Sequence, residues 1–208
     1  MILKESKEII LQNLSSIATE EKGISKSTEK TFLNPQLSID QSKLQNDFIA
    51  NFKMVSGEVH LLEEKGRLIE KINELIREFD AQSVSFWNIE PLKSLELTHE
   101  TDLASADIGI TGADFAIADT GTLVLLSGPE QPRLTSLLPP VHIAILKKET
   151  IVSNIHALFA TLGKSYEKNY DKLCTCISFI TGPSRTADIE LNLTLGVHGP
   201  RRAIVIIV

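Results

Sequence analysis

The chain ends on the stretch AIVIIV, residues 203–208, in which every side chain is apolar. A similar stretch, CTCISFI, occupies residues 174–180. Strands covered on both faces of a sheet read as near-continuous apolar runs of this kind, whereas half-exposed strands alternate polar and apolar residues. We therefore expect residues 176–180 and 203–208 to form buried strands of a largely parallel sheet.

Upstream of these runs, strand-like and helix-like patterns alternate. Apolar residues recur at helical intervals in 67–79 and in 151–162. Short strand-like stretches are GEVHLLE (57–63), SVSFW (83–87), the glycine-broken 107–127 and VHIAILK (141–147). Strands that alternate with helices predict an α/β fold, a Rossmann-like sandwich with a largely parallel sheet, in which 107–127 forms a hairpin or a mixed edge.

The first 56 residues have a different pattern of apolar and polar residues. Helical spacing of apolar residues occurs in 6–19 and again in 39–55, and the segment 20–36 between them is polar and contains Gly and Pro. We expect a helical N-terminal extension over 1–56 with a mobile segment near 20–36, followed by an α/β domain over 57–208.

Composition excludes some classes of partner. The 208 residues include 21 Lys and Arg against 27 Asp and Glu, a net charge of −6, and this balance argues against a nucleic-acid partner. No apolar run approaches the roughly 20 residues that a membrane helix needs. The start of the chain lacks the long apolar region of a signal peptide, so we expect a cytoplasmic protein.

The two cysteines, Cys174 and Cys176, are spaced to point to one face of a strand. We expect both to be small buried core residues, and two thiols cannot supply the four ligands of an iron–sulfur cluster or a structural zinc. His60, His99 and His156 show no metal-ligand spacing. We therefore predict no metal and no bound cofactor.

The loop between the two apolar runs reads TGPSRTADIELNLTLGVHGPRR, residues 181–202. Its middle predicts a short helix near 186–194, and the free N–H groups of a helix N-terminus favour an anion. Arg185 would add a planar fork that binds carboxylate or phosphate. The alternative is a capped turn in which Arg185 pairs internally with Asp188.

The end of this loop, GVHGPRR, contains His198 and Gly199 in a turn. His198 has a side chain that could transfer a proton near neutral pH or serve a structural role. We expect 181–188 and 197–201 to line one pocket at the carboxyl edge of the sheet. His142, by contrast, is expected to be a core or supporting residue at the end of a strand.

Two glycine-containing turns flank the apolar FAIA in 107–127. Residues 119–122, DTGT, provide a carboxylate, two hydroxyls and exposed amides, which would suit a polar ligand or would simply close a tight hairpin. Asp114 and Asp119 are five residues apart, an offset that puts strand side chains on opposite faces. We do not expect them to form an acid–base pair.

Three stretches together resemble the LUD-domain family, and specifically its lactate utilization protein C branch. They are GITGADFAIADTGTLVLLSGPEQPRLTSLLPPVHIAIL, ISFITGPSRTADIE and GVHGPRRAIVIIV. The resemblance is strong over about the last half of the chain and is expected to extend from residue 57 onward. One departure is Asp119, where the family usually has the longer Glu, and the shorter side chain would alter its reach.

The resemblance implies a fold similar to the NagB/RpiA/CoA-transferase group. It implies a role in bacterial L-lactate utilization, as a cluster-free partner of iron–sulfur subunits that oxidise lactate to pyruvate. The expected ligand is a small carboxylate or phosphate. The alternatives are a purely structural subunit, or a free-standing transferase or isomerase-like enzyme acting on a phosphorylated or CoA-linked substrate.

The motifs and the resemblance together give a set of candidate site residues. The candidate catalytic residues are Asp119 and His198. The candidate ligand-binding residues are Gly112, Asp114, Thr120, Gly121, Thr122, Arg133, Thr181, Gly182, Ser184, Arg185, Thr186, Asp188 and Gly199.

Overall fold

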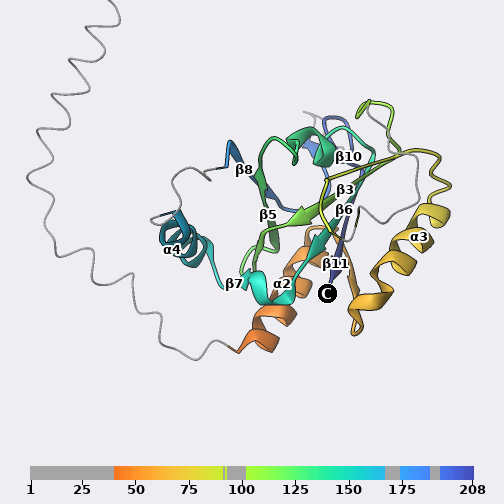
Figure 1. Cartoon of the computed structure of the whole chain (residues 1–208). Coiled ribbons are helices and arrows are strands. Elements are labelled where there is room, and N and C mark those ends of the chain that lie inside the picture. The colour runs from red at the N-terminus through yellow and green to blue at the C-terminus, as the bar shows by residue number, and fades with distance from the viewer. Residues whose placement is uncertain (1–39, 91, 93–101, 167–173, 188–192) are drawn as a thin grey trace, which may run out of the picture. The chain divides into compact units, whose positions relative to one another are not determined.

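A computed structural model of the chain describes residues 40–90, 92, 102–166, 174–187 and 193–208 (Figure 1). Residues Ile39–Val208 form one compact unit, and the architecture below is that of this unit. The helix predicted at 6–19 and the mobile segment predicted at 20–36 lie outside the described residues.

The first sheet, here the parallel sheet, has five strands in the order β1-β11-β6-β3-β2, and all of its pairings are parallel. The C-terminal apolar run forms the interior strand β11, between β1 and β6, and every residue from Ala203 to Ile207 is buried, which confirms that prediction. The strands are β1 (Glu58–Leu61), β2 (Val84–Phe86), β3 (Ile108–Ala113), β6 (Val141–Leu146) and β11 (Arg202–Ile207).

The second sheet, here the mixed sheet, has four strands in the order β7-β4-β5-β8. β4 and β8 each run antiparallel to β5, whereas β7 runs parallel to β4. The prediction that 107–127 contains a hairpin or a mixed sheet is therefore confirmed by β4 and β5. The strands are β4 (Phe115–Ile117), β5 (Thr122–Ser127), β7 (Ile151–Val152) and β8 (Cys176–Ile180).

The prediction that β8 is covered on both faces is wrong. Among the strands of the described residues, β8 forms the edge of the mixed sheet and pairs with β5 alone, and its Phe179 is 43% exposed. Cys174 lies before the strand begins, and both it and Cys176 are half-buried rather than core residues. An apolar run shows that a strand is hydrophobic, but it does not show whether the strand lies inside a sheet or at its edge.

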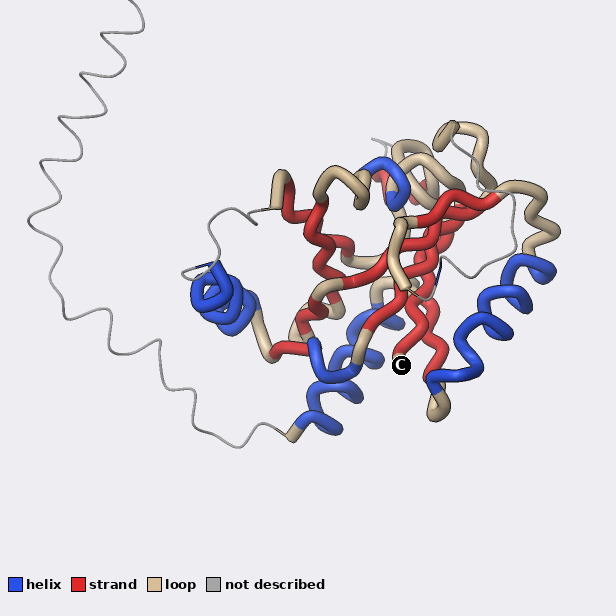
Figure 2. The backbone as a smooth tube through the Cα atoms, viewed as in Figure 1, coloured by secondary structure: helices blue, strands red, loops and turns tan. Residues whose placement is uncertain are grey.

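The helices and sheets form layers, with the two long sheets between α3 and α4 (Figures 1 and 2). α3 (Leu68–Glu78) packs its apolar side on one face of the parallel sheet, and α4 (Ile155–Tyr166) packs on the mixed sheet. The other faces of the two sheets meet in a shared core that also contains α2 (Gln41–Met54). This arrangement confirms the predicted α/β sandwich. The short helices are η2 (Lys65–Arg67), η4 (Arg133–Ser136) and η5 (Lys148–Thr150).

Helix α2 belongs to the α/β unit rather than to an extension. Asp40 caps its first turn by accepting N–H bonds from Ser42 and Lys43. Phe48 and Phe52 stack with ring centroids 5.5 Å apart and are fully buried in the core between the two sheets. The structure therefore differs from the predicted boundary after residue 56, since the compact unit begins at Ile39.

The helix predicted near 186–194 is wrong. Arg185–Ala187 (β9) and Leu193–Leu195 (β10) instead pair as antiparallel strands, with Arg185 opposite Leu195. The sequence IELNLTL, residues 189–195, alternates apolar and polar residues with period two, and this pattern outweighs the helix-capping residues before it. Asp188 lies outside the described residues.

Candidate functional site

A cavity of about 540 Å³ opens at the carboxyl edge of the parallel sheet. β3 contributes Gly112 and Ala113, β6 contributes Ile145, and Val208 follows the end of β11. In open α/β sheets, ligands bind in the crevice outside the carboxyl ends of the strands, because loops diverge there and leave space. We call this space the carboxyl-edge cavity.

The walls of the carboxyl-edge cavity are mainly apolar. Leu68 comes from the start of α3, and Trp87 and Ile89 follow β2. The indole N–H of Trp87 donates to the Pro132 carbonyl at 3.1 Å, which fixes this wall to the loop before η4. A Cβ on Gly112 would lie 3.0 Å from Ile89 Cδ1, so the glycine lets Ile89 approach the strand closely.

Lys147 supplies a cation to this cavity. It directly follows β6, and its carbonyl accepts hydrogen bonds from the Thr150 N–H at 3.0 Å and the Thr150 hydroxyl at 2.8 Å. Among the described residues, its ammonium group takes part in no ion pair. The turn holds the backbone of Lys147 in place while the charged end of the side chain stays available.

Asp114 supplies a carboxyl group whose ionisation is perturbed. Burial raises the pKa of Asp114 above its ordinary value, although its Oδ2 accepts a hydrogen bond from the Leu126 N–H at 2.8 Å. A carboxyl group with a raised pKa in a cavity can exchange a proton closer to neutral pH than an exposed one. Glu90, Gln131 and Thr150 complete the polar lining.

Of the predicted ligand-binding residues, Gly112 and Asp114 line the carboxyl-edge cavity. Sequence reasoning missed Lys147, Trp87, Glu90 and Gln131. Lys147 and Trp87 end the stretches VHIAILK and SVSFW, so the rule that ligands gather at strand carboxyl ends is the signal that would have found these two.

The DTGT turn, residues 119–122, holds helix α2. The Asn51 side-chain amide donates to the carbonyls of Ala118 at 2.8 Å and Asp119 at 3.2 Å. Gly121 has φ +61°, and a Cβ there would lie 2.3 Å from the backbone nitrogen of Phe52. The close approach of the α2 backbone therefore requires a glycine at this position.

The hydroxyl groups predicted to bind a ligand form a chain of hydrogen bonds in the same region. Thr122 Oγ1 lies 2.8 Å from Thr120 Oγ1 and 2.8 Å from Thr181 Oγ1. This chain ties the DTGT turn to the end of β8, so the structure brings Thr120, Gly121, Thr122 and Thr181 together. The exposed Asp119 belongs to the same turn.

Arg185 lies at the C-terminal end of α2. Its guanidinium donates a hydrogen bond to the Val55 carbonyl, one of the groups that a helix end leaves without an internal partner. Gly182 has φ +80°, and a Cβ there would lie 2.3 Å from the same carbonyl oxygen. A cation suits a helix C-terminus because the backbone dipoles make that end negative. The helix N-terminus expected at Arg185 is therefore wrong, since Arg185–Ala187 form strand β9.

The loops that contain Ser184 and His198 meet, but not where they were expected. The Ser184 N–H donates to the Pro200 carbonyl at 2.8 Å, and the Gly196 N–H donates to the Ser184 carbonyl at 3.0 Å. The Arg201 N–H donates to the Pro140 carbonyl at 2.8 Å, next to the starts of β6 and β11. These loops therefore lie at the amino edge of the parallel sheet, and the prediction of the carboxyl edge is wrong.

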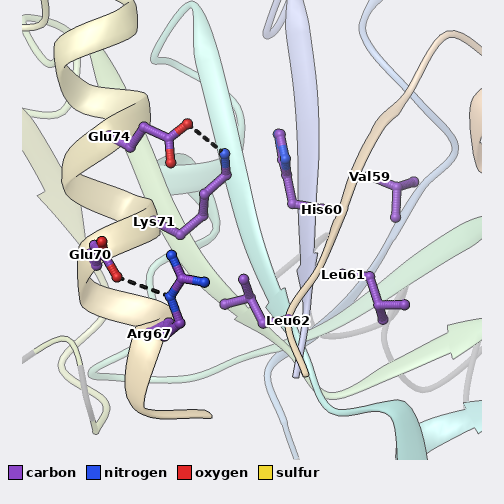
Figure 3. A pocket seen from close by; sticks show the side chains of 8 residues that line it. All are labelled: Val59, His60, Leu61, Leu62, Arg67, Glu70, Lys71 and Glu74. Carbon is purple, nitrogen blue, oxygen red and sulfur yellow. Dashed lines mark hydrogen bonds and ion pairs between the residues drawn. The ribbon is translucent and has the colours of Figure 1, made fainter. Parts of the chain in front are cut away.

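A second cavity of about 330 Å³ lies between β1 and α3 (Figure 3). Burial, followed by the charge of Lys71, lowers the pKa of His60 in its wall. Both cations in this wall are already paired, Lys71 with Glu74 at 2.9 Å and Arg67 with Glu70 at 3.1 Å. This cavity is less suited to an anion than the carboxyl-edge cavity.

His142 is a buried supporting residue, in line with the expectation. Its Nε2 shares a hydrogen bond with Thr111 Oγ1 at 2.8 Å, and burial lowers the pKa of His142 to about 4. The imidazole is therefore neutral at physiological pH and is buried.

The sequence pattern of the LUD domain matches residues 92–208, and the chain belongs to the LUD-domain family. Within that family it falls in the lactate utilization protein C branch, as the three stretches predicted. It is 38% identical over 160 residues to lactate utilization protein C of Halalkalibacterium halodurans, an alignment that covers 68% of this chain and 69% of that protein. It is 30% identical over 232 residues to lactate utilization protein C 1 of Bacillus mycoides, covering 100% and 98%.

A solved structure supports the fold. The crystal structure of a DUF162 family protein from Deinococcus radiodurans superposes with a TM-score of 0.59 over 81% of this chain and 98% of that chain. The identity is 19%, so this likeness shows the fold alone. In the part of the chain that the structure describes, no helix is long and apolar enough to span a membrane.

Proposed function

We propose that this chain works in L-lactate utilization as a cluster-free subunit beside iron–sulfur subunits that oxidise lactate to pyruvate. We propose further that it binds a small organic anion in the carboxyl-edge cavity. The relatives named lactate utilization protein C support the first part. The second part is carried by one observation, a Lys147 ammonium that forms no ion pair with any described residue, in a largely apolar cavity at the carboxyl edge.

In this proposal Lys147 binds the carboxylate of the ligand. A charge-assisted hydrogen bond in a partly dry cavity contributes more than one in water, because the local dielectric is lower. Gly112 lets Ile89 form the apolar wall of the cavity, and Asp114 contributes a group that either accepts or donates a proton according to pH. A 2-hydroxy or 2-oxo acid carries both groups that this arrangement requires.

The raised pKa of Asp114 also favours the alternative, a free-standing enzyme. A transferase or isomerase needs a group that gives and takes a proton near neutral pH, and burial moves Asp114 in that direction. Turnover of a phosphorylated or CoA-linked substrate by the isolated chain, lost in Asp114→Asn, would support this alternative over a binding subunit.

The amino edge offers a surface for the iron–sulfur subunits. Leu134, Leu137, Leu138 and Val197 are exposed there, from 36% to 52%, and a Cβ on Gly199 would lie 3.9 Å from the Leu137 carbonyl oxygen. Clustered exposed apolar side chains mark sites of protein–protein contact. The exposed cations on these segments are Arg133, Arg185 and Arg201, with His198 beside them.

We propose that this apolar and cationic face contacts an iron–sulfur subunit through an apolar patch flanked by carboxylates. Under this proposal the predicted site residues Arg133, Arg185, His198 and Gly199 contribute to partner binding, and Thr120, Thr122 and Thr181 hold α2. The Asp119 carboxylate is then a surface group of the turn.

Ligand binding is tested by titration calorimetry with lactate and pyruvate. Lys147→Met keeps the length of the side chain and removes its charge, and we expect affinity to fall about 10-fold or more, the scale of a charged hydrogen bond. Lys148→Met is the matched control, since Lys148 is exposed and lies outside the cavity lining. Equal affinities for the two variants would contradict the proposed anion site.

Partner binding is tested by co-purification with co-expressed iron–sulfur subunits. Leu138→Asp is expected to reduce recovery of the complex, because it places a carboxylate within the apolar face. Phe159→Asp is the matched control, an equally exposed apolar residue on α4. Loss of the complex in the control but not in Leu138→Asp would place the interface elsewhere.

A further inference from the structure

We infer that the carboxyl-edge cavity accepts an organic acid with a bulky apolar or aromatic body, and that lactate itself would leave most of the cavity unfilled. This inference rests on the proposed anion-binding function and adds the class of ligand. It depends on the size of the cavity and on how its apolar and polar groups are divided.

The size of the cavity is the first argument. An engineered protein cavity of about 150 Å³ binds benzene, which has as many non-hydrogen atoms as lactate. The carboxyl-edge cavity is about 540 Å³, more than three times as large. By the same ratio, a ligand that fills it has on the order of twenty non-hydrogen atoms. Cavities of this size in proteins hold ligands well above the size of a three-carbon acid.

The second argument is the large share of apolar side chains in the cavity lining. Apolar side chains come from four separate segments, Leu68 from α3, Ile89 after β2, Ala113 from β3 and Ile145 from β6. A three-carbon acid bound at Lys147 has one methyl group to place against them. Apolar walls that no ligand covers stay in contact with water, which contributes nothing to affinity.

The polar groups are few and sit at defined places on this lining. Lys147 is the cation, Asp114 and Glu90 are carboxyl groups, and Gln131 is an amide. A mostly apolar cavity with a few polar groups is the usual composition of a site for a medium-sized ligand, where polar groups orient it and apolar walls supply affinity. The ligand class that matches is a carboxylic acid, with a neighbouring hydroxyl or keto group, joined to a ring system.

A graded series of acids tests this inference. Lactate, phenyllactate and indole-3-lactate share the same carboxylate and hydroxyl groups and differ in the size of the attached body. Burial of an aromatic side chain contributes about as much as a tenfold change in affinity or more. By titration calorimetry, we expect phenyllactate to bind at least 10-fold more tightly than lactate, and indole-3-lactate to bind at least as tightly as phenyllactate.

A variant that fills the cavity separates this effect from nonspecific hydrophobic binding. Gln131→Trp places a ring in the lining, and the backbone pairing of Gln131 with Gly128 does not depend on the side chain. We expect the ratio of indole-3-lactate affinity to lactate affinity to fall toward one in this variant. Lys148→Trp, outside the lining, is the control and should keep the wild-type ratio.

The outcomes distinguish the two proposals. Equal affinity for all three acids, lost in Lys147→Met, would overturn the size inference and leave the proposed anion site standing. A rising series that is unchanged in Gln131→Trp would overturn the assignment to this cavity. No binding of any of the three acids would overturn both the anion site and the inference built on it.

Discussion

Gly121→Ala is expected to detach the end of helix α2 from the DTGT turn. Gly121 has φ +61°, a conformation that an alanine adopts only at a cost. A Cβ there would lie 2.3 Å from the Phe52 nitrogen and 2.5 Å from the Asn51 carbonyl carbon. Both contacts are with backbone atoms, which cannot rotate aside as the end of a side chain can, so the helix itself must move.

The size of the effect follows from two contributions. The left-handed backbone conformation costs about 1–2 kcal/mol for a residue with a Cβ. Displacement of packed backbone costs about 1–3 kcal/mol on the scale of overpacked cores. We therefore expect the free energy of unfolding to fall by roughly 2–5 kcal/mol in Gly121→Ala. Because Phe48 and Phe52 anchor α2 in the core, part of this loss reflects their weaker packing.

Urea unfolding measures the change in stability, and amide hydrogen exchange of α2 shows whether the helix is released. Gly128→Ala is the matched control, because a Cβ at Gly128 meets nothing within 4 Å and its φ is not positive. The control is expected to stay within about 0.5 kcal/mol of the wild type. If Gly121→Ala is as stable as Gly128→Ala and the amides of α2 stay protected from exchange, the close contact of α2 with the turn does not require a glycine.

Two further predictions concern single side chains. Arg185→Met should lower the free energy of unfolding, measured by urea titration, by about 1 kcal/mol, because it removes a charged donor from the exposed helix end at Val55. The control Arg133→Met should change the free energy of unfolding by less than half of that amount. His142 remains neutral in the folded protein down to about pH 4 but takes up a proton below about pH 6.5 when unfolded. Stability is therefore lost as the pH falls from about 6.5 to about 4, by up to roughly 3 kcal/mol. His142→Gln, whose amide oxygen still faces Thr111, should flatten this part of the stability profile, and an unchanged slope would contradict the burial argument.

The elements that could be predicted from the sequence are those set by local pattern. Most of the apolar run 203–208 forms the buried interior strand β11, and the helical spacing in 67–79 forms α3. The prediction that β8 is covered on both faces was wrong, because an apolar strand at a sheet edge has the same sequence pattern as one in the middle of a sheet. The helix predicted after Arg185 was wrong for a different reason, because Ser, Thr and Asp favour both helix caps and turns.

The candidate site was harder to predict because it depends on which chain segments, distant in sequence, lie side by side in the fold. The positive φ at Gly121 and Gly182 could be expected from their turns, but the chain segment that approaches them could not. That segment is the end of α2, more than 60 residues before Gly121. Lys147 was missed because a lysine after a strand has no distinguishing local pattern, and only the strand order places it beside Gly112 and Asp114.

The most direct test of the central claim is a crystal structure of this chain soaked with phenyllactate. We expect electron density for the acid in the carboxyl-edge cavity, with the carboxylate within hydrogen-bond distance of Lys147 Nζ and the ring against Ile89 and Ile145. Density at the amino edge beside Arg185 and His198, with the carboxyl-edge cavity holding only water, would contradict it.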